Sequence, residues 1–116
     1  MQYIQLVEFD ASHSVDAVRD ALDDWLAKSR GKRPLQMALV AADHDRPNHY
    51  WNLLMFPSER EATEASQLPE TQEAFERWSK LLDGEPVFHN LDVVNQLGGP
   101  SAAPVDHLLE KTPGAG

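Results

Sequence analysis

Apolar residues alternate with polar ones in four segments of the chain, and this period of two predicts strands. The predicted strands run over Gln2–Phe9, Leu35–Ala42, His49–Phe56 and Val87–Val94. Between the second and third lies the turn-forming stretch 43–48, which predicts a hairpin.

In the two remaining regions apolar residues recur at every third or fourth position, and this spacing predicts helices. Ser14 is placed to cap the first, which carries Asp16 in its first turn and ends at Gly31. Its apolar stripe consists of Val15, Val18, Leu22 and Trp25. The region therefore predicts one amphipathic helix with its acidic residues off the stripe.

The second helical region is divided by proline. Ser58 and Glu61 have the spacing of a capping box, so a short helix is expected from there to about Gln67. Leu68-Pro69 ends it, because proline suits the first turn of a helix and not its interior. A second helix follows up to Gly84, with a stripe of Ala74, Phe75, Trp78, Leu81 and Leu82.

The order β-α-β-β-α-β predicts an α+β, ferredoxin-like fold. Two right-handed crossovers give a four-stranded antiparallel sheet with the helices on one face. This domain occupies residues 1–96, and Gly, Pro and Ala dominate the tail over 97–116. The tail is interpreted either as a flexible end or as an arm whose segment Val105–Leu109 packs on a second subunit.

Alternation sorts the strand residues into two faces. The wholly apolar sets are expected beneath the helices: Leu35, Met37 and Leu39, then Trp51, Leu53 and Met55, then Val87, Leu91 and Val93, with Val7 and Phe9. The opposite face is still too apolar for water, yet it carries a few polar groups. We expect a homodimer that covers it, enclosing either a ligand cavity or a plain packed interface. The residues predicted to bind ligand there are Leu6, Glu8, Tyr50, Asn52, Leu54, Phe88 and Asn90.

Composition narrows the possible chemistry. The 116 residues include no cysteine, which excludes disulfides, thiol nucleophiles and thiolate metal sites. A net charge of −9 argues against nucleic acid and against anionic membranes as partners. No apolar run has the length of a membrane span, and the N-terminus lacks the features of a signal peptide, so we expect a cytoplasmic protein.

One element pattern is characteristic of a family. Phe56-Pro57-Ser58-Glu59, the segment Leu68–Phe75 and the returning strand Pro86-Val87-Phe88 follow each other in the β-α-β-β-α-β order. Over about residues 2–95 the chain resembles the dimeric α+β barrel superfamily, in its antibiotic-biosynthesis monooxygenase-like branch. The resemblance implies a homodimer whose two sheets close into a barrel.

The resemblance does not carry over the family's known reactions. Haem-degrading members use an asparagine, a tryptophan and a histidine at positions that here hold Leu6, Ala65 and Phe75. Quinone-forming members favour asparagine and tryptophan in the first helical piece, and the stretch 61–65 supplies neither. No cofactor is implied.

The remaining candidates are polar side chains on the strands. Tyr50 and Asn52 are placed to orient a carbonyl or phenol, and Asp92 or His89 to act as a base. Asp43-His44-Asp45 with His49 offers metal-ligand types, but at a hairpin tip these residues favour turns, and no metal site is predicted. Trp25, Trp51 and Trp78 are expected in the core.

Two functions remain open. The first is a homodimer that binds a small apolar or aromatic molecule and acts as a cofactor-independent monooxygenase or isomerase. The second is a non-catalytic dimer that binds a ligand or a partner.

Overall fold

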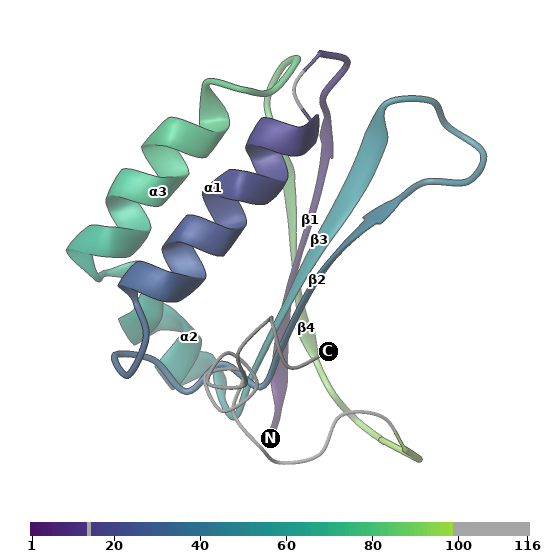
Figure 1. The fold of residues 1–116 in the computed structure, drawn as a ribbon. Helices are drawn as coiled ribbons and strands as arrows, with labels where there is room; N and C mark the ends of the chain where they lie inside the picture. The colour runs from purple at the N-terminus through teal and green to yellow at the C-terminus, as the bar shows by residue number, and fades with distance from the viewer. Residues whose placement is uncertain (14, 99–116) are drawn as a thin grey trace, which may run out of the picture.

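A computed structural model describes residues 1–13 and 15–98 and shows one sheet covered on a single face by helices (Figure 1). The elements are β1 (Tyr3–Asp10), α1 (Val15–Lys28), β2 (Met37–Ala42), β3 (His49–Phe56), α2 (Glu59–Ser66), α3 (Pro69–Ser79) and β4 (Val87–Asp92). The strands are antiparallel neighbours in the order β2-β3-β1-β4. The predicted α+β, ferredoxin-like architecture is confirmed. Ser14 and residues 99–116 of the tail lie outside the described residues.

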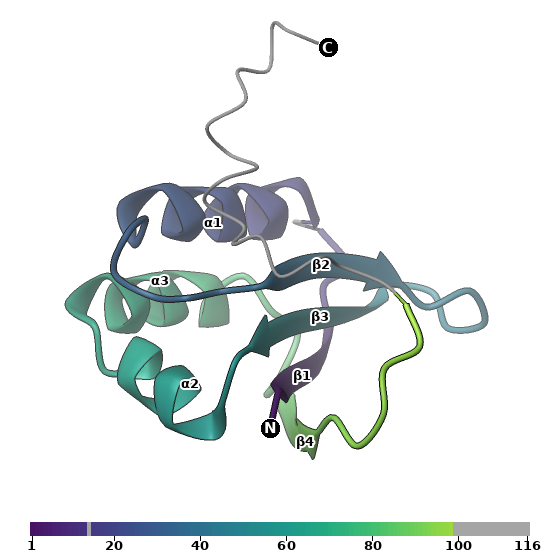
Figure 2. The same ribbon diagram turned by 90° about the horizontal axis from the view of Figure 1, so that it is seen from below.

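Local sequence explains where the second helical region begins and breaks. Ser58 caps α2, because its hydroxyl oxygen accepts from the Glu61 N–H at 3.3 Å while the hydroxyl donates to the Glu61 carboxylate at 3.2 Å. Pro69 occupies the first turn of α3, as predicted. The break turns the chain so that α3 lies beside α1 over the sheet, and α2 packs against β1 and β3 (Figure 2).

The core consists of two clusters separated along the sheet. Tyr3, at the start of β1, belongs to one cluster, and Phe9, near its end, belongs to the other. The first also contains Trp25, Leu35 and Phe56. The interval between the clusters, above Gln5 and Val7, holds a pocket rather than close-packed side chains.

The assignment of strand faces corrects the prediction for β2, β3 and β4. Val7 pairs in register with Asn52 on one side and Phe88 on the other, so these side chains share the helix-facing surface. The apolar sets expected beneath the helices lie on the uncovered face instead. We call it the open face, and its strand residues are Ile4, Leu6, Glu8, Asp10, Met37, Leu39, Ala41, His49, Trp51, Leu53, Met55, Val87, His89 and Leu91.

The physical reason is that alternation separates two faces without saying which face the helices cover. The helix-facing set is the more polar one because part of it lines a pocket. The predictions for Val7 and Phe9, which are buried beneath the helices, are confirmed. Leu35 is also buried there, although it precedes β2.

Candidate functional site

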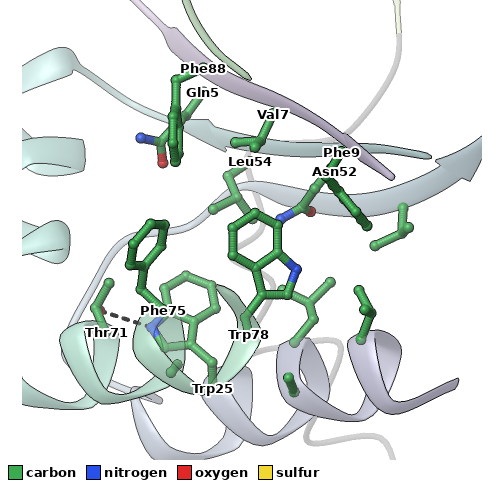
Figure 3. Close-up of a pocket in the computed structure, with 15 residues that line it drawn as sticks. Gln5, Val7, Phe9, Trp25, Asn52, Leu54, Thr71, Phe75, Trp78 and Phe88 are labelled. Carbon is green, nitrogen blue, oxygen red and sulfur yellow. Dashed lines mark hydrogen bonds between the residues drawn. The ribbon is translucent and has the colours of Figure 1, made fainter. Parts of the chain in front are cut away.

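A cavity of about 120 Å³ lies between the helix pair α1 and α3 and the helix-facing side of the sheet (Figure 3). We call it the sheet–helix pocket. Its walls come from every strand and from both long helices: Gln5, Val7, Phe9, Val18, Ala21, Leu22, Trp25, Val40, Asn52, Leu54, Thr71, Ala74, Phe75, Trp78 and Phe88. In Figure 3 the labelled side chains of sheet and helices point toward one another across this space.

Aromatic rings shape the pocket. Trp78 meets Phe9 edge-on, with ring centroids 5.2 Å apart, and meets Phe75 at 5.6 Å. Phe75 in turn lies 5.9 Å from Phe88 across the gap between α3 and β4. These two phenylalanines are 46% and 43% exposed, so they form the mouth, whereas Phe9 is buried at the closed end.

The pocket has a sparse polar lining. The Trp25 indole N–H donates to the Thr71 hydroxyl oxygen at 2.8 Å, which joins α1 to α3 and satisfies the indole. The Asn52 Oδ1 atom is buried without a hydrogen-bond partner among the described residues. None of the described lining residues carries an ionisable side chain. The pocket is therefore an uncharged, largely apolar space, and one residue of its wall holds a buried acceptor without a partner.

Three of the residues predicted to bind ligand line this pocket: Asn52, Leu54 and Phe88. Tyr50 stacks on Phe9 at 5.8 Å, at the closed end. Tyr50 does not line the pocket, because the ring of Phe9 lies between Tyr50 and the cavity.

The polar residues of β4 that face the helices lie beyond the pocket as well. Asn90 accepts a hydrogen bond from the Tyr3 hydroxyl at 2.6 Å, and Asp92 is exposed opposite Tyr3. Burial, together with the nearby Glu59 and Asp92 carboxylates, raises the pKa of the Tyr3 hydroxyl. The Tyr3 phenol thus stays protonated as a hydrogen-bond donor, and Asp92 has no pocket to act on.

Leu6, Glu8 and His89 lie on the open face, away from the pocket. Alternation with the apolar set Val87, Leu91 and Val93 placed His89 beneath the helices and Glu8 on the opposite face, but the His89 Nε2 atom is 2.8 Å from a Glu8 carboxylate oxygen. The other Glu8 oxygen lies 3.0 Å from His49 Nε2, and His49 Nδ1 lies 2.7 Å from Asp10. We call Glu8, Asp10, His49 and His89 the Glu8 cluster.

His49 is buried between two carboxylates, and each of its ring nitrogens contacts one of them. Because an ionised carboxylate only accepts hydrogen bonds, both contacts form only if both ring nitrogens donate, as they do in an imidazolium. The hydrogen bonds from His89 and then from His49 hold the pKa of Glu8 below its usual value.

Trp51, which was expected in the core, covers the Glu8 cluster on the open face. Its ring stacks on His89 with centroids 6.3 Å apart and meets His49 edge-on at 5.6 Å. Its indole N–H donates to Asp43 at 3.2 Å. Hydrogen bonds from the Asp45 N–H and from this indole lower the pKa of Asp43.

The hairpin residues with metal-ligand side chains do not converge. The His44 side chain is 99% exposed and contacts Asp45, whereas His49 is buried against the sheet. Within residues 1–13 and 15–98, no three His, Asp or Glu side chains are arranged to hold a metal ion.

Several pocket residues were not predicted as ligand contacts. Gln5, Trp25, Thr71, Phe75 and Trp78 all line the cavity. For the four on α1 and α3, the shared signal is their position opposite the mixed polar and apolar face of the sheet. It is usable only once that face is assigned to the helices.

Of the helices in the described segments, none is long and apolar enough to cross a membrane.

The chain is similar to solved structures, although its sequence alone matches no protein-family model and no characterised protein. A candidate antibiotic biosynthesis monooxygenase from Chloroflexus aurantiacus is 22% identical with a TM-score of 0.66, over 84% of this chain and 98% of that one. The Mycobacterium tuberculosis protein Rv0793 gives a TM-score of 0.70 at 13% identity, over 84% and 100%.

The cofactor-independent oxygenase SnoaB from Streptomyces nogalater is also similar, with a TM-score of 0.69 at 11% identity over 84% of this chain and 98% of that one. The fold is that of the antibiotic biosynthesis monooxygenase structures. The resemblance inferred from the element order is thus confirmed at the level of the fold.

Proposed function

We propose that this chain binds a small, uncharged, hydroxylated aromatic molecule in the sheet–helix pocket. One observation carries the proposal: the buried Asn52 Oδ1 atom lacks a partner in the wall of a largely apolar cavity. A ligand hydroxyl that donates to this oxygen would remove the cost of an unsatisfied buried acceptor. The aromatic side chains of Phe75, Trp78 and Phe88 supply ring contacts for the rest of the molecule.

The volume and lining support a ligand of about one ring. An apolar cavity of about 150 Å³ accommodates benzene, and this cavity has about 120 Å³ with an open mouth between Phe75 and Phe88. A larger ring system would have to displace these two side chains. A carboxylate or ammonium group is disfavoured, because no described lining residue offers a counter-charge.

Fluorescence and NMR titrations with phenol, toluene and benzoate test the proposal. We expect phenol to bind more tightly than toluene, and benzoate not to bind. Asn52→Leu should reduce phenol affinity to that of toluene, because it removes the acceptor while keeping a side chain of similar shape. Asn95→Leu, at an exposed position beyond β4, serves as the matched control. Benzoate binding as tight as phenol, or a phenol preference that survives in Asn52→Leu, would contradict the proposal.

A second candidate function is cofactor-independent monooxygenation of such a ligand. It is supported by the fold shared with SnoaB, which is described as a cofactor-independent oxygenase. In this reaction one molecule of O₂ converts a phenol to a quinone: one oxygen atom becomes the new carbonyl and the other leaves as water. Since no ionisable side chain lines the described pocket, both hydrogens of this water would come from the phenol itself, one from its hydroxyl and one from the ring carbon that becomes the new carbonyl.

Oxygen uptake separates this candidate from binding alone. The candidate predicts one O₂ consumed per quinone formed and one ¹⁸O atom incorporated from ¹⁸O₂, both lost in Asn52→Leu. Phenol binding without oxygen uptake would instead support the non-catalytic alternative.

We also propose that two copies of the chain associate through the open face. Leu39, Val87 and Leu91 are 41–50% exposed on this one surface. The chain carries a net charge of −9, but the charged groups of the open face are paired with one another in the Glu8 cluster. Two acidic copies therefore meet less like-charge repulsion on this face than their net charge of −9 would suggest. Light scattering over a concentration series tests the dimer.

A further inference from the structure

The Glu8 cluster is the one group of closely packed charges on the open face of the described chain, and the sheet–helix pocket does not use it. It lies where the proposed dimer would remove it from water. Burial of charges is favourable only when they balance and are hydrogen-bonded. The state of charge of the cluster therefore bears on whether two copies can associate.

The charges around His89 can be named element by element. Glu8 and Asp10 lie on β1, His49 lies on β3, and Asp43 and Arg46 lie on the hairpin between β2 and β3. Arg46 is 3.8 Å from Glu8, and Asp43 is joined to the cluster through Trp51. The three ionised carboxylates outnumber Arg46 by two, and the buried His49, which contacts two of them, can balance at most one, so a negative charge is left over. A proton on His89 would neutralise it.

His89 is placed to take up this proton. Its Nε2 atom contacts Glu8 at 2.8 Å, and its ring lies against Trp51. The His89 side chain is 40% exposed, so a second copy on the open face would cover it, whereas His49 is already buried. Covering His89 removes the water that screens its contact with Glu8, which strengthens the attraction between carboxylate and imidazolium.

We propose that His89 makes association through the open face depend on a proton, so that two copies bind each other more tightly when His89 is an imidazolium. The inference rests on the proposed dimer and adds its regulation. Imidazole side chains change charge between about pH 5 and pH 8. The dimer is then favoured at mildly acidic pH, and it weakens as His89 loses its proton.

Sedimentation equilibrium at about pH 6, 7 and 8 and constant ionic strength tests the inference. If each protomer holds one more proton in the dimer than as a monomer, the dimer weakens as the pH rises. The dissociation constant of the wild-type chain should then increase by about tenfold or more from pH 6 to pH 8. His89→Asn should remove most of this change. His44→Asn is the matched control, because it deletes an imidazole from a side chain that is 99% exposed on the hairpin.

The outcomes are separable. Equal pH dependence in the wild-type chain and in His89→Asn would overturn the role of His89 and leave the dimer intact. A monomer at every pH and concentration would overturn the dimer and this inference together, without affecting phenol binding in the pocket. His89→Gln, with folding checked by circular dichroism, guards against a folding defect particular to one substitution.

Discussion

Trp51 and Asn52 are adjacent in β3, and their side chains serve opposite faces of the sheet. Trp51 stacks on His89 over the open face, and Asn52 lines the sheet–helix pocket beneath the helices. The Glu8 cluster and the sheet–helix pocket thus lie on opposite sides of the same strand, with only its backbone between them. The separation means that ligand binding and association between copies can be changed by different substitutions.

Replacing Asn52 with leucine should stabilise the ligand-free protein. The Oδ1 atom is buried without a partner, and a leucine of similar shape removes that unsatisfied acceptor. We expect the free energy of unfolding in urea to rise by about 1 kcal/mol. Asn95→Leu, at an exposed site, should change it by less than about 0.5 kcal/mol. A clear loss of stability in Asn52→Leu would mean that the amide is satisfied in the free protein.

Thr71→Val should weaken the contact between α1 and α3. The valine has the shape of threonine but cannot accept the hydrogen bond that the Trp25 indole donates at 2.8 Å, so the indole N–H is left unsatisfied. We expect the free energy of unfolding to fall by about 1–2 kcal/mol. Thr63→Val, which makes the same change at an exposed position of α2, should be close to neutral. Equal effects of the two variants would contradict the role of the Thr71 hydroxyl.

The element order was predictable from sequence because each element carries its own period and its own end signals. His49–Phe56 was predicted with the observed bounds, and Pro69 begins α3 as expected. The strand faces were not predictable in the same way. Pairing in register joins odd-numbered residues of β1 to even-numbered residues of β3, so Val7 lies beside Asn52. The alternation within each strand does not reveal how the residues of one strand pair with those of the other.

The contacts of the candidate site depend on tertiary structure. Glu8 and His89 are 81 residues apart in the chain and meet only because β4 pairs with β1. Asn52 was predicted to contact a ligand; it lines a cavity, but on the helix-covered face rather than on the face where a cavity was expected. Trp78 was assigned to the core by its helical stripe, and its helix does face the core, but its ring forms a wall of the pocket.

Glu8→Gln should change stability in a pH-dependent way. Hydrogen bonds from His89 and His49 lower the pKa of Glu8 in the folded chain below its ordinary value of 4.5. A lowered pKa contributes stability above the unfolded value, and that contribution is lost as the pH falls through the folded value. The variant should therefore be less stable than the wild-type chain at neutral pH, and the gap should narrow below about pH 4.5. Urea midpoints measured between neutral and acidic pH check this. A gap independent of pH would contradict it.

Leu91→Lys should prevent association without unfolding the chain. Leu91 is 43% exposed on the open face, so a lysine there keeps its ammonium in water in the monomer and loses that water in the dimer. Because a symmetric dimer would bury one such charge from each copy, we expect its dissociation constant to rise by at least about 100-fold. Val94→Lys is the matched control, since Val94 is 87% exposed and lies beyond the end of β4. Light scattering should find the Leu91 variant monomeric, with the circular dichroism spectrum and phenol affinity of the wild-type chain. If the variant were dimeric, the contact between copies would lie on a surface other than the open face.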